Sequence, residues 1–366
     1  NCNTLVLAFI SPHQMSTPTI EILINRTARD NFIDFCIKYG YDVATFPPYR
    51  VFQIIWVLVA ILSMMNITRV YWKHVRCSKL HRNIRILLTL FLGTAVMLNF
   101  VFSIYQIYQL SLSFTAVHPC EVFLPRNFYK CFNILFGLIL ELYLFIQTAI
   151  TFERAIATIC VRSYEYTEAY PAIIAIISAV LVAIGTQVFL YYGKDFNQPQ
   201  LSVLNPPAEV YDKINGLLIF NEITCGITFV SMIILVIVNM KREKKAIGDL
   251  SRRFQTEENI DTTKFIAKVS LIQMISYTSQ SLGSLILRLV EESFAGAQAL
   301  PMRTTLKLAI YGMPLYTLVM SIVIEYSTRT SARYRQNRLQ SAVSTKNEAQ
   351  AYSNFLSKQW HIEDQS

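Results

Sequence analysis

Long apolar runs alternate with short polar segments along most of the chain. A membrane-spanning helix needs about 20 mostly apolar residues, and seven runs are of about that length. They cover approximately residues 51–68, 86–110, 128–151, 170–192, 215–240, 265–290 and 305–326. The third is the most polar, with Asn133, Glu141 and Gln147, and the sixth carries Gln273 and Gln280. The pattern predicts an all-α membrane protein, a bundle of seven transmembrane helices.

Lys and Arg concentrate on one side of this predicted bundle. The segment after the first span holds Arg69, Lys73, Arg76, Lys79, Arg82 and Arg85. The segment after the fifth holds Lys241, Arg242, Lys244, Lys245, Arg252, Arg253 and Lys264. Loops on the other side hold few basic residues: Arg126, Lys130, Lys194 and Lys213. Because cytoplasmic loops carry the excess of Lys and Arg, we expect the N-terminus outside the cell and the C-terminus inside.

This topology divides the chain into three parts. Residues 1–50 form an extracellular N-terminal segment, residues 51–326 the seven-helix bundle, and residues 327–366 a cytoplasmic tail. The sequon that begins at Asn25 lies in the first part, so Asn25 is a candidate glycosylation site. A second sequon, at Asn66, falls at the inner end of the first span and is interpreted as a chance match.

Composition favours a lipid environment and argues against other classes of protein. Of the 366 residues, 53% are hydrophobic and only 16% are charged, whereas a soluble domain carries about a quarter charged residues. The net charge of +9 comes from short loops, which is not the pattern of a nucleic-acid-binding face. The histidines have no metal-ligand spacing, and no phosphate loop or nucleophile motif is present. We therefore expect no enzymatic activity, metal site or cofactor.

Four cysteines, Cys2, Cys36, Cys120 and Cys131, lie outside the predicted membrane or near its outer boundary. Disulfides persist in that oxidising environment. The favoured pair is Cys36 with Cys120, which would tie the N-terminal segment to the start of the third span. Cys131 is a rival partner, and unpaired small apolar cysteines remain the alternative.

Ionisable and amide side chains within the spans or near their ends are candidates for ligand binding. They are Glu141, Glu222, Gln280, Arg288 and Lys307. Glu141 lies at the middle of the third span, where such a group must face the bundle interior and be paired or protonated. Each also has a structural interpretation as an interhelical hydrogen bond. For the two basic residues, the structural alternative is an ion pair with Glu291 or Glu292.

Glu153 and Arg154 end the third span on the predicted cytoplasmic side. An acid beside a base can form an ion pair there that opens when a partner reaches the cytoplasmic cleft. The alternative is an ordinary basic anchor at the membrane surface. We expect the long side chain of Arg154 to reach the membrane interface and to need no buried partner.

Pro314 interrupts the seventh predicted span. Proline removes one backbone donor from a helix and clashes with the preceding turn. The seventh helix is therefore expected to kink at this residue, which suits a hinge.

Several motifs resemble those of one receptor family. Residues 250–259, LSRRFQTEEN, resemble the signature that precedes the sixth helix in the nematode Sra superfamily of serpentine chemoreceptors. Residues 153–158 with Tyr164-Glu165, the basic stretch 79–83, the segment 48–53 and Cys36 are also similar. The resemblance runs from about Cys36 to Tyr326. Within the superfamily the Sre branch resembles the chain most, with Srb and Srab close.

The resemblance implies a G-protein-coupled chemosensory receptor in the plasma membrane of sensory neurons, in their cilia. It implies an external small-molecule or peptide ligand and a heterotrimeric G protein as partners. The residues expected to face the G protein are Glu153, Arg154, Arg252 and Arg253. A membrane transporter or channel is the alternative, although the chain has no internal repeat and only Pro314 clearly breaks a helix.

Overall fold

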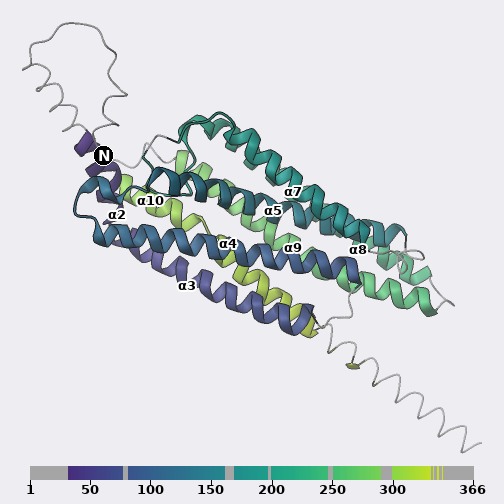
Figure 1. The fold of residues 1–366 in the computed structure, drawn as a ribbon. Coiled ribbons are helices and arrows are strands. Elements are labelled where there is room, and N and C mark those ends of the chain that lie inside the picture. Colours follow the sequence, from purple (N-terminus) through teal and green to yellow (C-terminus); the bar gives the residue numbers. More distant parts are fainter. Residues whose placement is uncertain are drawn as a thin grey trace, which may run out of the picture.

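The computed structural model describes residues 32–76, 81–160, 169–196, 199–245, 250–289 and 299–330, and a few positions beyond them. These residues form a bundle of long helices that run roughly parallel or antiparallel to one another (Figure 1). The helices are α3 (Pro47–Val70), α4 (Arg82–Thr115), α5 (Arg126–Ile159), α7 (Tyr170–Tyr191), α8 (Tyr211–Lys245), α9 (Leu250–Leu289) and α10 (Ala299–Ile310). Helical backbone resumes at residues 313–330. All seven predicted spans therefore coincide with helices.

Six helices in the described ranges are long and apolar enough to cross a membrane. The exception is α9, which has 40 residues but is too polar by composition. Except for α7, which matches its predicted span to within one residue, the helices are longer than the apolar runs that predicted them, because helical backbone continues into polar residues. The third span, for example, was expected over residues 128–151, and α5 has 34 residues.

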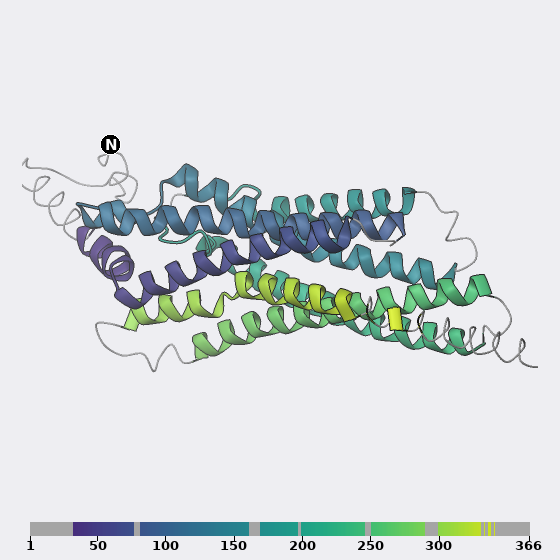
Figure 2. The same ribbon diagram turned by 90° about the horizontal axis from the view of Figure 1, so that it is seen from below.

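The helices differ in how deeply they lie in the bundle. The pairs α3 with α4, α5 with α7 and α8 with α9 are in extensive contact (Figure 2). In the most apolar stretches of α4 and α5, 61% and 56% of the residues are buried, whereas in those of α7 and α8 only 22% are buried. On α7 the outward residues include Ile174, Leu181 and Val188. This apolar outer surface is what a helix facing lipid presents, and α4 and α5 form the centre of the bundle.

The seventh span is broken just before Pro314, as the sequence predicted. The helix α10 ends at Ile310, and Tyr311 and Gly312 are not helical. Proline has no N–H, so Pro314 cannot donate to the carbonyl of Ile310; the N–H of Gly312 donates to that carbonyl instead, at 2.7 Å. Gly283 of α9 leaves room for the break, because a Cβ there would lie 2.6 Å from a methyl carbon of Ile310.

Residues 32–46 fold over one end of the bundle. They pass through η3 (Ile37–Tyr41) and α2 (Asp42–Ala44) into α3, whose first residues are Pro47 and Pro48. Proline is favoured there, because the first turn of a helix leaves its N–H groups unpaired in any case. Near this end lies a small apolar cluster that contains Val43, Ala44 and Val122. We call this the disulfide end of the bundle, after the bond described next.

Candidate functional site

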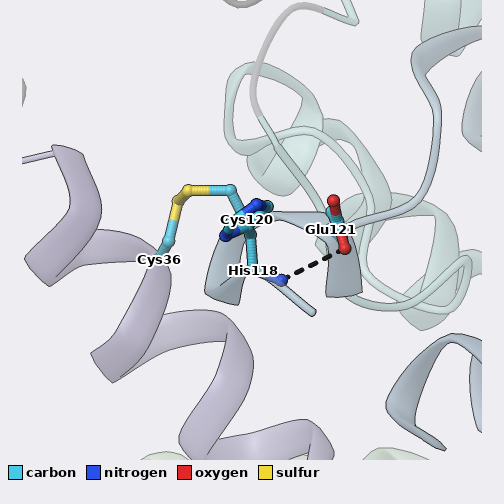
Figure 3. The surroundings of a disulfide bond; sticks show 4 residues. All are labelled: Cys36, His118, Cys120 and Glu121. Atoms are coloured by element: carbon cyan, nitrogen blue, oxygen red, sulfur yellow. Dashed lines mark hydrogen bonds between the residues drawn. A yellow bond between two sulfur atoms is a disulfide. The ribbon is translucent and has the colours of Figure 1, made fainter. Parts of the chain in front are cut away.

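A disulfide joins residues 32–46 to the segment that precedes α5 (Figure 3). The sulfur atoms of Cys36 and Cys120 are 2.10 Å apart, and the two residues are 84 positions apart in the sequence. Cys120 lies in the short helix η5 (Pro119–Val122). Cys131, the rival partner in the sequence, is a free, exposed cysteine in the structure. The bond fixes the N-terminal segment at the mouth of the bundle.

Glu121 organises the loop that carries Cys120. Its Oε2 accepts hydrogen bonds from the backbone N–H groups of Val117, at 2.9 Å, and His118, at 3.1 Å (Figure 3). These two bonds, that from His118 first, lower the pKa of the Glu121 carboxyl. The carboxylate thereby satisfies two backbone donors of an exposed turn and holds the bonded cysteine in place.

A glycine permits close contact between the two segments that the disulfide joins. A Cβ at Gly40 would lie 2.8 Å from the ring of Phe123 and 2.9 Å from Val122. The ring of Phe35 stacks on Phe123, with ring centroids 6.1 Å apart. The disulfide and the stacked rings of Phe35 and Phe123 hold residues 32–46 against the loop before α5, and the absence of a side chain at Gly40 lets the two segments come this close.

Beside residues 32–46, the connection between α7 and α8 enters the bundle. We call residues 199–207 of this connection the plug. Leu201, Ser202 and Val203 are all buried. Side chains of α4 and α5 donate to the plug carbonyls: Gln109 to Leu201, Tyr129 to Asn205 at 2.6 Å and Asn133 to Val203 at 2.7 Å. Irregular backbone can be buried only when its polar groups are satisfied in this way. The plug therefore occupies the disulfide end of the bundle in a defined position.

Farther into the bundle, Glu141 forms an interhelical hydrogen bond. Its Oε1 accepts from Nδ2 of Asn221 on α8, at 2.8 Å, and both residues are buried. This is the interhelical contact that the structural interpretation expected. Asn221 was not singled out from the sequence, where the charged neighbour Glu222 drew attention. Only the packing of α8 against α5 turns Asn221 inward.

In the described part of the structure, the other candidate ligand-binding residues form no hydrogen bond with the side chains of this pair. Glu222 accepts a hydrogen bond from the Thr278 hydroxyl of α9 and is partly exposed. Gln280 is partly buried on α9, and Lys307 is part of α10. The backbone of Arg288 lies in α9, but its side chain is outside the described part of the structure, as is the whole of Asn25.

At the opposite end of α5, Glu153 and Arg154 form a bidentate ion pair. Nε and Nη2 of Arg154 each donate to one carboxylate oxygen of Glu153, both at 2.6 Å. The two side chains are only 2% and 3% exposed. The expectation that Arg154 reaches the membrane interface and needs no buried partner is therefore wrong. Because α8 and α9 pack over this end of α5, the guanidinium is enclosed and needs the adjacent carboxylate.

Side chains of α8 and α9 hold the same end of α5. The last carbonyls of a helix have no partner within the helix. Here the carbonyl of Ala157 accepts from Asn259 of α9, at 3.4 Å, and that of Thr158 accepts from Arg242 of α8. Asn239 of α8 donates to the Thr158 hydroxyl at 3.0 Å. Three helices thus meet around Glu153 and Arg154, an arrangement that separation of α8 or α9 from α5 would open.

The remaining sequence candidates at this end are only partly described. Arg252 and Arg253 lie in the first turn of α9, and their side chains are outside the described part of the structure. Within the described ranges, no group of three or more His, Cys, Asp or Glu could hold a metal ion.

Comparison with known proteins places these features in a family context. The family model described as serpentine type 7TM GPCR receptor class ab chemoreceptor matches residues 37–361. Serpentine receptor class beta-16 of Caenorhabditis elegans is 26% identical over 318 residues, which are 85% of this chain and 92% of the relative. Serpentine receptor class beta-17 of the same organism is 24% identical over 335 residues, 89% of this chain and 91% of the relative. These matches favour the ab and beta classes, and the Sre branch that the motifs suggested first is unsupported.

Proposed function

The chain belongs to the serpentine type 7TM GPCR receptor class ab chemoreceptor family, and on that premise we propose that it detects an external ligand and activates a heterotrimeric G protein. It is a multi-pass membrane protein of a nematode receptor family and is not an enzyme. We further propose that it acts in the plasma membrane of sensory neurons, in their cilia. The family match gives the transporter or channel alternative no supporting observation.

The proposed orientation has the disulfide end outside the cell and the Glu153–Arg154 end inside. Two independent features support it. Lys and Arg are concentrated in the segments that follow the first and fifth spans, as cytoplasmic loops require. The Cys36–Cys120 disulfide lies at the other end, and disulfides persist on the oxidising side of the membrane.

The buried Glu153–Arg154 pair is the observation that carries the signalling proposal. In the resting receptor the carboxylate of Glu153 binds the Nε–Nη2 edge of the Arg154 guanidinium, while Asn239, Arg242 and Asn259 bind the end of α5 to its neighbours. Ligand binding shifts the bundle toward a form in which α8 and α9 move away from this end. The freed guanidinium of Arg154 then binds carbonyls at the C-terminus of a Gα helix, where the helix dipole favours a cation. Arg252 and Arg253, in the first turn of α9, face the same partner.

Orientation and signalling are tested in the same cells. The full chain, tagged at both ends, is expressed in cells that report second messengers and membrane current, and a panel of small organic molecules is applied. We expect the N-terminal tag to be stained on intact cells and the C-terminal tag only after permeabilisation. Asn25→Gln should remove an endoglycosidase-sensitive mass shift. A C-terminal tag accessible on intact cells would overturn the orientation.

The G-protein step is tested with a nucleotide that blocks it. We expect at least one compound to evoke a second-messenger change that GDPβS in the cell abolishes. Arg154→Ala should lose most of this response. Arg69→Ala is its matched control and should signal normally, because Arg69 also forms an ion pair, with Glu325, but its side chain is 60% exposed. A ligand-evoked current that persists in GDPβS would overturn the proposal in favour of a channel.

A further inference from the structure

The Glu141 carboxylate is buried, and no cation from the described residues compensates its charge. The residue is 3% exposed and lies 15 positions after the start of α5, which is about 22 Å along a helix that rises 1.5 Å per residue. Asn221 occupies Oε1, and Oε2 has no hydrogen-bond partner among the described residues. No Lys or Arg in those residues forms an ion pair with it. A carboxylate at this depth requires either a proton or a positive partner.

Other buried polar groups that the structure describes, on α8, α9 and the seventh span, also lack a hydrogen-bond partner. Oδ1 of Asn221 and the hydroxyl groups of Tyr277 and Tyr311 are buried and have no hydrogen-bond partner in the described part of the chain. Tyr277 packs in the same buried cluster as Tyr143 and Leu144, which follow Glu141 on α5, and Tyr311 packs against that cluster. Each tyrosine hydroxyl can donate or accept a hydrogen bond, whereas the carboxylate oxygen and the amide oxygen can only accept. These two oxygens, on Glu141 and Asn221, are therefore the groups that are left without a donor within the described ranges.

A proton on Glu141 would remove its charge but would supply only one donor. An ammonium group supplies three donors and a positive charge. Phe136 lies five residues before Glu141 on α5, and its ring packs against that of Tyr311, with centroids 5.9 Å apart. Aromatic faces also favour a cation. A protonated amine with a short apolar tail therefore meets the charge, hydrogen-bond and packing requirements together.

We infer that Glu141, Asn221 and Tyr277 form a binding site for a small protonated amine, whose ammonium group contacts Oε2 of Glu141. The inference rests on the proposed function, because it names the chemical class of the external ligand. The site lies deeper in the bundle than the plug. The amine reaches it from the disulfide end when residues 199–207 move.

Binding is measured on the purified full chain in detergent, without a G protein, so that the result does not depend on signalling. The probes are primary n-alkylamines from ethylamine to octylamine and the n-alcohols of matched length, at constant pH 7 and constant sodium chloride. We expect at least one amine to raise the thermal unfolding temperature with saturable dependence on concentration, and the matched alcohol to have no such effect. Sodium contributes equally to every sample.

Two variants locate the bound amine. Glu141→Gln should weaken amine binding by about 100-fold or more, since one partner of a buried ion pair is removed. Glu243→Gln removes the same charge from a partly exposed residue at the other end of α8 from Tyr211, and should bind the amine as the unchanged chain does. If Glu141→Gln does not fold, Glu141→Asp serves instead, and should keep the preference for amine over alcohol with weaker binding.

The outcomes separate this inference from the proposed function. If no amine stabilises the chain more than its matched alcohol, or if Glu141→Gln binds amines unchanged, the amine site is wrong even where the receptor signals to other compounds. If amines bind through Glu141 but no second messenger changes in cells, the site stands and the signalling proposal fails.

Discussion

The indole N–H of Trp56 on α3 donates to the backbone carbonyl of Leu308 on α10, at 2.9 Å. In a continuous helix that carbonyl would accept from the N–H of Gly312, four residues on. At the break before Pro314, the N–H of Gly312 bonds to Ile310 instead. Trp56 therefore fills a position that the break leaves vacant, and both Trp56 and Leu308 are buried. A side chain of the first span thus supplies the hydrogen bond that the Leu308 carbonyl loses at the interruption of the seventh span.

Replacement of Trp56 by Phe should destabilise the bundle. The ring remains apolar, but the Leu308 carbonyl loses its donor, and an unsatisfied buried acceptor costs about 1–2 kcal/mol. The measurement is the thermal unfolding temperature of the purified chain. Trp72→Phe is the control, because Trp72 is 53% exposed and its replacement should leave the temperature within error. Equal effects of the two variants would contradict the role given to Trp56.

Loss of the disulfide should destabilise the chain and release its N-terminal segment. Cys36→Ser or Cys120→Ser removes a bond that closes a loop of 84 positions, and such losses typically cost about 2–5 kcal/mol. The double variant should be no less stable than either single one. Cys131→Ser, at a free and exposed cysteine, is the control and should match the unchanged chain. Peptide mapping that finds both Cys36 and Cys120 alkylated in the native protein would refute the pairing.

Asn133→Ala should loosen the plug. The variant removes the donor to the Val203 carbonyl, so that the plug loses one of its buried attachments. Hydrogen exchange measured by mass spectrometry should be faster in residues 199–207 and unchanged in α3. Asn127→Ala is the control, because Asn127 is exposed on the same helix, and it should not alter hydrogen exchange in the plug. Unchanged protection of the plug in Asn133→Ala would show that this bond does not hold it.

Arg154→Ala should reduce stability as well as signalling, because it leaves the Glu153 carboxylate buried without its bidentate partner. Removal of one member of a buried pair costs about 3–5 kcal/mol. The double variant Glu153→Gln/Arg154→Met removes both charges and should recover most of the stability but not the signalling. Thermal unfolding and surface staining, compared with the second-messenger response, distinguish the two effects. If the double variant signals normally, Arg154 does not couple ligand binding to the G protein.

The sequence by itself determined the number, order and approximate positions of the helices. Lipid imposes that constraint, because a spanning segment must be apolar over about 20 residues and must satisfy its own backbone. It also determined where the seventh helix breaks, since Pro314 lacks an N–H in any surroundings. The ends of the helices were not predictable in this way. Helical backbone in α5 and α9 extends into polar residues, where hydropathy gives no signal.

Only the tertiary structure decided which side chains meet. Glu141 is conspicuous in the sequence, but its partner Asn221 is 80 residues away and is turned inward by the packing of α8 against α5. Arg154 reads as a basic residue free to reach the membrane surface, yet α8 and α9 enclose it. The periodicity of one helix in the sequence indicates which of its faces are apolar and which are polar. Which face is covered, and by what, depends on neighbours far away in the chain, so burial and pairing arise only when the bundle assembles.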